Sequence, residues 1–286
     1  MFRKQEEYYS TEMEQELNQK LAIFYEKIRG KKILIGLTGG LKSYMLVELA
    51  RPVVTEMKCM FVETSYTSPS DLEYVRNFKK NDDNAEIETD VIQKLDLNQN
   101  ILILNSDERD FFCKKGIADI LEKERSSNGY DVILDGTAGE QFQSFWNGKQ
   151  KFGDNYLMIF GELGIFREDV VYLSKKHGFK FNRPPEINLL SRFAYNIPIT
   201  EDLLKLVVVM EGFLKNLTNN DLVRVRILDK DHIIIETGQK ELSRLLDEKT
   251  RKKIYNEFSD KGFSSINIDL AGYRRNNLFK ASKNTL

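Results

Sequence analysis

Apolar residues along the first half of the chain follow two alternating patterns, helical spacing and short continuous runs. Residues 10–29 place apolar side chains on one face of a helix, and residues 33–37 form the kind of apolar run found in buried parallel strands. The same alternation predicts further helices at 43–50, 70–80, 112–123 and 167–177 and further strands at 58–62, 100–104 and 131–134. Strands that alternate with helices indicate an α/β fold with a parallel sheet covered on both faces.

The pattern changes after the pair Pro184-Pro185. The remaining predicted elements are a helix at 200–216, strands at 222–228 and 232–237, a helix at 239–256 and a strand at 265–270. This order indicates a smaller α+β unit. We therefore predict two domains, residues 1–183 and residues 184–286.

Two glycines stand between the first predicted strand and its helix, in the loop Thr38–Ser43 (TGGLKS). Because glycine has no side chain, the backbone there can approach a phosphate closely, and the N–H groups at the start of a helix point toward it. The loop is neither a Walker A sequence nor a dinucleotide fingerprint. The glycines alone fit both a phosphate site at the carboxyl ends of parallel strands and an ordinary tight turn.

Composition narrows the classes of function. The 286 residues are 41% hydrophobic and 30% charged, as in soluble globular proteins, and the net charge of -1 argues against a nucleic-acid partner. No apolar run approaches the roughly 20 residues that span a bilayer, and the first residues do not resemble a signal peptide. Two cysteines cannot form a disulfide framework or a four-cysteine metal site. We expect a cytoplasmic protein with no membrane partner.

The glycine loop resembles the pyrophosphatase loop (PP-loop) of the N-type ATP pyrophosphatases, usually Ser-Gly-Gly-x-Asp-Ser. More specifically, the chain resembles the LarE family, ATP-dependent sulfur transferases that build the nickel-pincer nucleotide cofactor. The segments that resemble this family follow in the same order, at 64–76, 109–115, 135–138, 162–178, 190–200, 224–226 and 270–274. The resemblance implies a HUP-like (adenine nucleotide alpha hydrolase-like) PP-loop domain followed by a smaller domain.

This resemblance implies that a small-molecule carboxylate attacks ATP at its α-phosphate and releases pyrophosphate. A sulfur nucleophile then displaces AMP, and magnesium is the usual companion of the nucleotide. The cofactor-binding positions expected from the loop and the resemblance are Leu37, Thr38, Gly39, Gly40, Ser43, Thr64, Asp135, Gly136 and Thr137. Catalytic roles are expected for Lys42, Ser43 and Arg192. The resemblance also implies a homo-oligomer.

The chain departs from the family where the sulfur and metal chemistry lies. Lys42 replaces the loop aspartate, so its ammonium rather than a loop-bound magnesium ion would neutralise phosphate. Asn188 falls on the family's cysteine, and Asp110 falls on the first cysteine of its Cys-x-x-Cys pair. Because an iron–sulfur cluster needs thiolate ligands, we expect none and infer an external sulfur donor.

Cys113 is the cysteine that remains from that pair. It lies in an apolar helix face, where a free thiol commonly acts as a small buried hydrophobe. The alternative is a thiolate or persulfide carrier activated by Lys114, Lys115 and the helix start.

The second predicted domain offers an anion site. Arg224 and Arg226 lie two residues apart on a strand, so their side chains face the same way and can clamp a phosphate or carboxylate, with Arg192 as a further contact. The alternative is a solvated strand face paired with Glu211 or Glu236. In the family, acidic residues at these two positions are implied to hold a divalent ion.

Three further functions stay open beside sulfur transfer. Adenylation that ends in an amide would use ammonia as the nucleophile, from an external donor. A non-catalytic nucleotide-binding or assembly subunit would explain the replaced loop aspartate and sulfur residues. Thiolation of tRNA is least consistent with the near-neutral charge.

Overall fold

The computed structural model describes residues 9–81, 88–95, 99–143, 152–179 and 188–274, with the side chains of 77–81, 88–95 and 99–100 outside the description. The chain forms two compact units. The first unit comprises Met1–Glu63, Pro69–Leu95 and Cys113–Asn182. The second unit comprises Thr64–Ser68, Asp96–Phe112 and Arg183–Leu286. Two short segments from the first half of the sequence therefore belong to the second unit.

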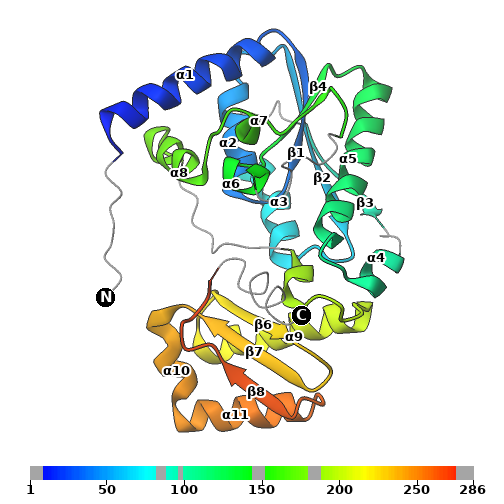
Figure 1. Ribbon diagram of the computed structural model, residues 1–286, viewed down its shortest axis with the longest axis vertical. Helices are drawn as coiled ribbons and strands as arrows, with labels where there is room; N and C mark the ends of the chain where they lie inside the picture. Colours follow the sequence, from blue (N-terminus) through cyan, green and yellow to red (C-terminus); the bar gives the residue numbers. More distant parts are fainter. Residues whose placement is uncertain (1–8, 82–87, 96–98, 144–151, 180–187, 275–286) are drawn as a thin grey trace. The chain divides into compact units, whose positions relative to one another are not determined.

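The first unit contains a five-stranded sheet in the order β3-β2-β1-β4-β5 (Figure 1). Its strands are β1 (Lys32–Leu37), β2 (Glu56–Thr64), β3 (Glu88–Leu95), β4 (Val132–Asp135) and β5 (Tyr156–Leu157). β1 pairs in parallel with β2 on one side and β4 on the other, and β5 pairs in parallel with β4. The predicted α/β class with a parallel sheet is confirmed.

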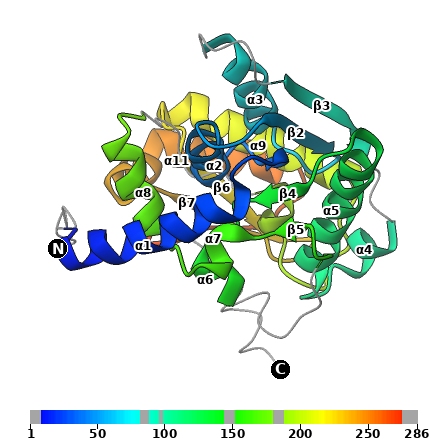
Figure 2. The same cartoon turned by 90° about the horizontal axis from the view of Figure 1, so that it is seen from above.

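Helices cover both faces of this sheet. They are α1 (Thr11–Ile28), α2 (Leu41–Ala50), α3 (Pro69–Asn81), α5 (Arg109–Asn128), α6 (Gly139–Gln141), α7 (Ile159–Glu162) and α8 (Arg167–Lys176). Figure 2 shows α5 on one face and α1, α2 and α8 on the other. Successive residues of β1 face opposite sides of the sheet. Ile35 joins the core formed with α1, α2 and α8, whereas the next residue, Gly36, faces Leu121 of α5.

The first helix begins and ends at signals present in the sequence. The Ser10 hydroxyl caps α1 by accepting a hydrogen bond from the Met13 N–H at 3.2 Å, and Gly30 follows the helix with φ 70°. The predicted apolar face is the buried one, with Phe24 and Ile28 fully inaccessible. Burial of this stripe attaches α1 to the rest of the first unit.

The prediction of a strand at 100–104 is wrong, because this run forms helix α4 (Gln99–Leu104) of the second unit. Leu102 is buried, but Ile103 and Leu104 are 52% and 67% exposed, so the run does not lie inside a sheet. Asn105 ends the helix with a left-handed φ of 41°. A short apolar run has no periodicity that separates a strand from one turn of helix. β2 lies between β1 and β3, and the sequence pattern did not predict strand β3.

The second unit contains a mixed sheet in the order β6-β7-β8, formed by β6 (Val223–Ile227), β7 (His232–Thr237) and β8 (Ser265–Ile268). β6 and β7 are antiparallel, whereas β7 and β8 are parallel. Besides α4, this unit contains the 3-10 helices η2 (Leu189–Arg192) and η3 (Gln239–Glu241) and the helices α9 (Glu201–Thr218), α10 (Leu242–Leu246) and α11 (Glu248–Ser259). This is an α+β arrangement.

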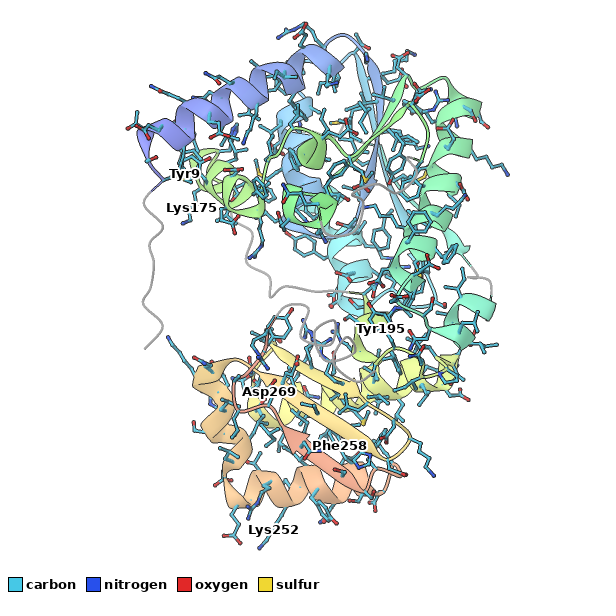
Figure 3. The ribbon with its side chains drawn as sticks, viewed as in Figure 1. Tyr9, Lys175, Tyr195, Lys252, Phe258 and Asp269 are labelled. Carbon is cyan, nitrogen blue, oxygen red and sulfur yellow. The ribbon has the colours of Figure 1, made fainter. Side chains whose placement is uncertain are left out.

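The predicted helix at 239–256 is interrupted in the second unit. Asp247 separates α10 from α11, and its carboxylate accepts a hydrogen bond from the Thr250 N–H at 3.0 Å as an N-cap. α11 then presents Phe258 to the core, where its ring centroid lies 6.0 Å from that of Phe213 on α9, while Lys252 points outward (Figure 3). No helix among the described residues is long and apolar enough to cross a bilayer.

Candidate functional site

The glycine loop lies between β1 and α2, at the carboxyl end of the central strand. β1 ends at the buried Leu37, and α2 begins at Leu41. Gly39 has φ 71°, a left-handed conformation that is strained for residues with a Cβ, and Gly40 is the extended N-cap of α2. The two glycines thus allow the chain to turn directly from the strand into the helix.

The Ser43 hydroxyl holds this loop together from inside. It is fully buried, donates to the Gly40 carbonyl at 3.0 Å and accepts from the Thr38 N–H at 3.2 Å. Its oxygen also lies 3.2 Å from the Thr38 hydroxyl oxygen. The Thr38 side of the loop is exposed, so Thr38 faces the solvent while Ser43 braces the backbone behind it.

The turn after β4 packs directly against the first turn of α2. A Cβ placed on Gly136 would lie 3.0 Å from the Ser43 backbone nitrogen and 3.1 Å from the Lys42 carbonyl carbon. β1 and β4 are adjacent, with Gly36 and Asp135 in register. The structure therefore brings the loop Thr38–Ser43 and the Asp135-Gly136-Thr137 turn together at one edge of the sheet.

The Asp135 carboxylate is the centre of a buried network. Its Oδ1 accepts hydrogen bonds from the Lys114 ammonium at 2.9 Å and the Thr137 N–H at 2.8 Å, as well as from the Thr137 hydroxyl. Its Oδ2 accepts from the Tyr156 hydroxyl at 2.8 Å, and the Lys114 ammonium also donates to the Thr137 hydroxyl. Asp135 is only 6% exposed. The carboxylate thus braces the turn instead of pointing into solvent.

Electrostatics keep this carboxylate ionised. Burial opposes ionisation of Asp135, but the charge of Lys114 and the hydrogen bonds from Thr137, Lys114 and Tyr156 outweigh it, so the pKa lies below the ordinary value. Burial, together with the negative charge of Asp135, raises the pKa of Tyr156 well above its ordinary value. Lys114 lies 21 residues from Asp135 in the sequence, so no sequence spacing revealed this partnership.

Lys42 lies on the rim of the loop and is half-buried. Its ammonium donates a hydrogen bond to the Gln141 side-chain oxygen on α6. Gln141 was not among the predicted site residues, because nothing in the sequence places this short helix beside the loop. The contact holds the Lys42 ammonium against α6.

Cys113 is 3% exposed and is the fifth residue of α5. The two lysines expected to activate it are both bound to carboxylates, Lys114 to Asp135 at 2.9 Å and Lys115 to Asp119 at 2.8 Å. Cys113 forms no disulfide. These contacts favour the structural interpretation of this cysteine.

Thr64 ends β2 and belongs to the second unit. It is buried, and its N–H donates to the Thr67 hydroxyl at 2.9 Å. Asn188 precedes η2, and its carbonyl accepts a hydrogen bond from the Ser191 hydroxyl at 2.9 Å.

The second unit buries two arginine–glutamate pairs. Arg192 donates to Glu211 through Nε at 2.9 Å and a terminal nitrogen at 3.3 Å, and Arg226 donates to Glu236 at 3.0 Å. All four residues are at most 6% exposed. Burial raises the pKa of Glu211, but Arg192, Arg224 and the Val225 N–H hold it below its ordinary value overall.

Arg224 is fully buried as well, with its guanidinium 5.7 Å from the centre of the Tyr273 ring and a hydrogen bond to the Val223 carbonyl at 2.7 Å. Arg224 and Arg226 therefore do not form the solvated strand face considered above. The Glu211 and Glu236 carboxylates, expected to hold a divalent ion, are counter-ions of arginines. Within the described residues, no three His, Cys, Asp or Glu side chains are grouped as a metal site would need.

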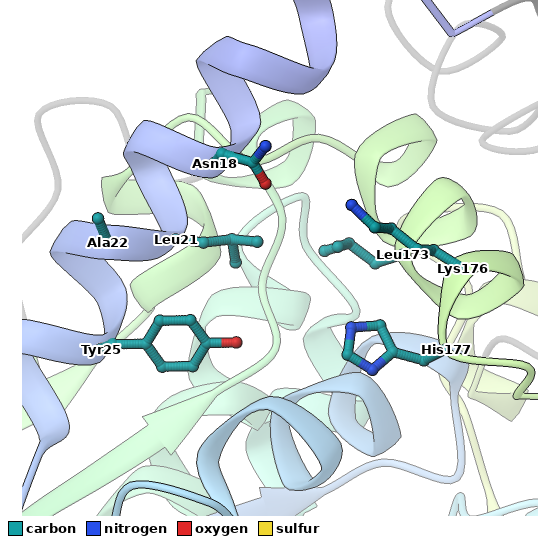
Figure 4. Close-up of a pocket in the computed structure, with 7 residues that line it drawn as sticks. All are labelled: Asn18, Leu21, Ala22, Tyr25, Leu173, Lys176 and His177. Carbon is teal, nitrogen blue, oxygen red and sulfur yellow. The ribbon is translucent and has the colours of Figure 1, made fainter.

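A hollow of about 310 Å³ lies elsewhere in the first unit, between α1 and α8 (Figure 4). Its lining residues are Asn18, Leu21, Ala22, Tyr25, Leu173, Lys176 and His177. None of the predicted site residues lines it. The Lys176 ammonium at its edge is bound to Glu14 at 2.6 Å.

Fold and site together define an α/β protein whose parallel sheet carries a glycine loop and an Asp-Gly-Thr turn at the ends of two adjacent strands. No family model matches the sequence. The chain is 31% identical over 252 residues to MJ0830 of Methanocaldococcus jannaschii, an uncharacterized protein, covering 87% of this chain and 93% of the relative. It is 26% identical over 253 residues to slr1717 of Synechocystis, also uncharacterized, covering 86% and 91%. The protein belongs to the family of MJ0830.

Proposed function

We propose that this protein is a LarE-like PP-loop ATP pyrophosphatase with a HUP-like nucleotide domain, which adenylates a small-molecule carboxylate. The carboxylate oxygen attacks the α-phosphorus of ATP, the bond to the β-phosphate oxygen breaks, and pyrophosphate leaves with the electron pair. The products are an acyl-adenylate and pyrophosphate. Such a reaction on cytoplasmic metabolites fits the expected location, and the resemblance to LarE adds a homo-oligomer to the proposal.

The observation that carries this proposal is the packing of Gly136 against the first turn of α2. It makes the loop and the turn a single surface at the carboxyl ends of β1 and β4. Thr38 is exposed and Gly40 is the half-buried N-cap of α2, so the Thr38 hydroxyl and the start of this helix offer donors to an anion. Lys42, the second residue of α2, would supply a positive charge to stabilise the departing pyrophosphate.

Magnesium is not assigned a protein ligand in this proposal. The donor set does not fit a magnesium site, because the loop carries Lys42 and the Glu211 and Glu236 carboxylates are bound to arginines. A role for the buried Arg192, Arg224 and Arg226 in substrate binding is proposed on the resemblance to LarE alone.

The second half-reaction is proposed to use an external sulfur donor. Sulfide attacks the acyl carbon, AMP leaves with the electron pair, and a thiocarboxylate forms. Neither Asn188 nor Asp110 carries sulfur, and Cys113 is buried, so no described side chain at these positions is placed to supply it. Ammonia in the same role yields an amide, and mass analysis of the product separates the two outcomes by the element that is incorporated.

Exchange of labelled pyrophosphate into ATP tests the first half-reaction. We expect exchange that depends on an added carboxylate from a panel of small acids. Lys42→Met should lower the exchange rate at least tenfold, as expected when one charge at a phosphate site is lost. The matched control is Lys123→Met on the exposed face of α5, which should exchange like the wild type. Absence of both exchange and ATP binding by calorimetry would overturn the proposal.

A non-catalytic nucleotide-binding subunit is the second candidate. The observation that favours it is Lys42, which stands in place of the loop aspartate and is bound to Gln141. ATP binding by calorimetry without carboxylate-dependent exchange, with and without a sulfur or ammonia donor, would establish this function in place of adenylation.

A further inference from the structure

We propose that Lys114 is a positioning residue of the candidate phosphate site. By neutralising Asp135, it keeps the Asp135-Gly136-Thr137 turn from repelling an anion bound at the loop Thr38–Ser43. This inference rests on the proposed nucleotide site, although Lys114 itself stands outside the loop. The Lys114–Asp135 ion pair takes no direct part in the proposed adenylation.

Three observations place the Lys114–Asp135 ion pair beside the loop Thr38–Ser43. The Lys114 ammonium lies 2.9 Å from Asp135 Oδ1, and it also donates to the Thr137 hydroxyl. Asp135 is nine-tenths buried and is fixed from its other side by Tyr156 at 2.8 Å. Gly136, between Asp135 and Thr137, would bring any Cβ to 3.0 Å from the Ser43 backbone nitrogen. The carboxylate is therefore next to the residue that touches the start of α2.

The charge balance follows from these contacts. With Lys114 present, the turn carries one positive and one negative charge 2.9 Å apart and so little net field. Without Lys114, a carboxylate screened by little solvent would remain beside an oligophosphate carrying several negative charges. Repulsion in such a partly buried place is much stronger than in water. The penalty should rise with the charge of the ligand, whereas a mere loosening of the turn would weaken all ligands alike.

A second buried ion pair in the same unit provides a matched control. Lys58 on β2 lies 2.9 Å from Glu124, with side chains only 11% and 20% exposed. Glu124 lies on α5 ten residues after Lys114, about 15 Å away along the helix. Loss of either lysine leaves a poorly solvated carboxylate and should lower the thermal stability, but only the Lys114 pair lies beside the loop.

The experiment measures the binding of ATP, AMP and adenosine by calorimetry to the full-length wild type and four variants. Lys114→Met should weaken ATP binding by about tenfold, AMP binding by less, and adenosine binding not at all. The double variant Lys114→Met/Asp135→Asn should recover most of the ATP affinity, because the Asp135 carboxylate that would lack its counter-ion is also removed. Asp135→Asn alone removes the negative charge and leaves the Lys114 ammonium, so it should bind ATP more tightly than the wild type, and Lys58→Met should bind all three ligands unchanged.

The outcomes separate this inference from the proposed function. Wild-type protein that binds no nucleotide overturns both. Wild-type binding of ATP with an unchanged affinity in Lys114→Met overturns the role of Lys114 and leaves the nucleotide site standing. An equal loss for ATP and adenosine, or no recovery in the double variant, would show that the lysine is only a structural support. If Lys114→Met does not fold, weaker ATP binding by a folded Asp135→Asn contradicts the charge argument.

Discussion

Gly136 and Ser43 lie so close that a methyl group on Gly136 would stand 3.0 Å from the Ser43 backbone nitrogen. This single approach joins the end of β4 to the start of α2. The two nearest atoms are backbone atoms of Ser43 and Lys42, which cannot move aside as the end of a flexible side chain would. The join between loop and turn therefore depends on the missing side chain at this position.

Gly136→Ala should destabilise the protein by about 1–3 kcal/mol, the usual cost of overpacking a close contact. Thermal unfolding followed by circular dichroism measures this. The control is Gly212→Ala within α9, where a Cβ meets nothing within 4 Å and the backbone is not left-handed. That substitution should raise stability slightly, by about 0.5–1 kcal/mol, because alanine favours a helix over glycine. A Gly136→Ala protein as stable as the wild type would contradict the close packing.

The ionised state of Asp135 should make stability depend on acid pH. The pKa of this carboxyl is lower in the folded protein than in the unfolded chain, so the folded state favours ionisation. This stabilisation is complete above the unfolded-state pKa of about 4 and is lost as the pH falls through the lower folded-state value. Denaturant unfolding at pH 2 to 7 should show a weaker acid dependence for Asp135→Asn than for the wild type.

Breaking one buried pair in the second unit should be costly. Glu211→Gln leaves the 1% exposed Arg192 without its carboxylate and should lower the unfolding free energy by about 3–5 kcal/mol. The double change Arg192→Met/Glu211→Met should recover part of this loss, since the buried Arg192 charge is removed together with its carboxylate. Chemical denaturation measures both. An exposed glutamate on the same helix, Glu201→Gln, serves as the control, and equal effects at the two positions would refute the argument.

Cys113→Ser should leave the pyrophosphate exchange within about twofold of the wild type and reduce stability by about 1–3 kcal/mol, the cost of burying a hydroxyl. The physical reason is that the thiol is buried and both neighbouring lysines are bound to carboxylates. Cys59→Ser, at a fully buried position of β2, is the matched control. Loss of exchange or of sulfur transfer in Cys113→Ser but not in Cys59→Ser would support the interpretation of Cys113 as a thiolate carrier.

Part of the fold was readable from local signals. Ser10, the apolar stripe of α1 and Gly30 predicted the first helix, because capping and helical spacing act within a few residues. The run at 33–37 predicted β1, since a strand buried on both faces is continuously apolar. The same criterion predicted a strand at 100–104, and that prediction is wrong. Its five residues carry no period that distinguishes strand from helix, and the contacts that decided in favour of α4 involve Asn105 with Ala194 and Ile197, far along the chain.

The sequence by itself determined most of the alternation of strands and helices and the glycine loop after β1. These are local properties, because capping, periodicity and side-chain chemistry belong to neighbouring residues. Only the tertiary structure decided that Gly136 touches Ser43, that Lys114 neutralises Asp135 and that Arg192 and Arg226 are buried with glutamates. Those outcomes depend on which strands become neighbours and on how far water is excluded, and both are set by packing between distant parts of the chain.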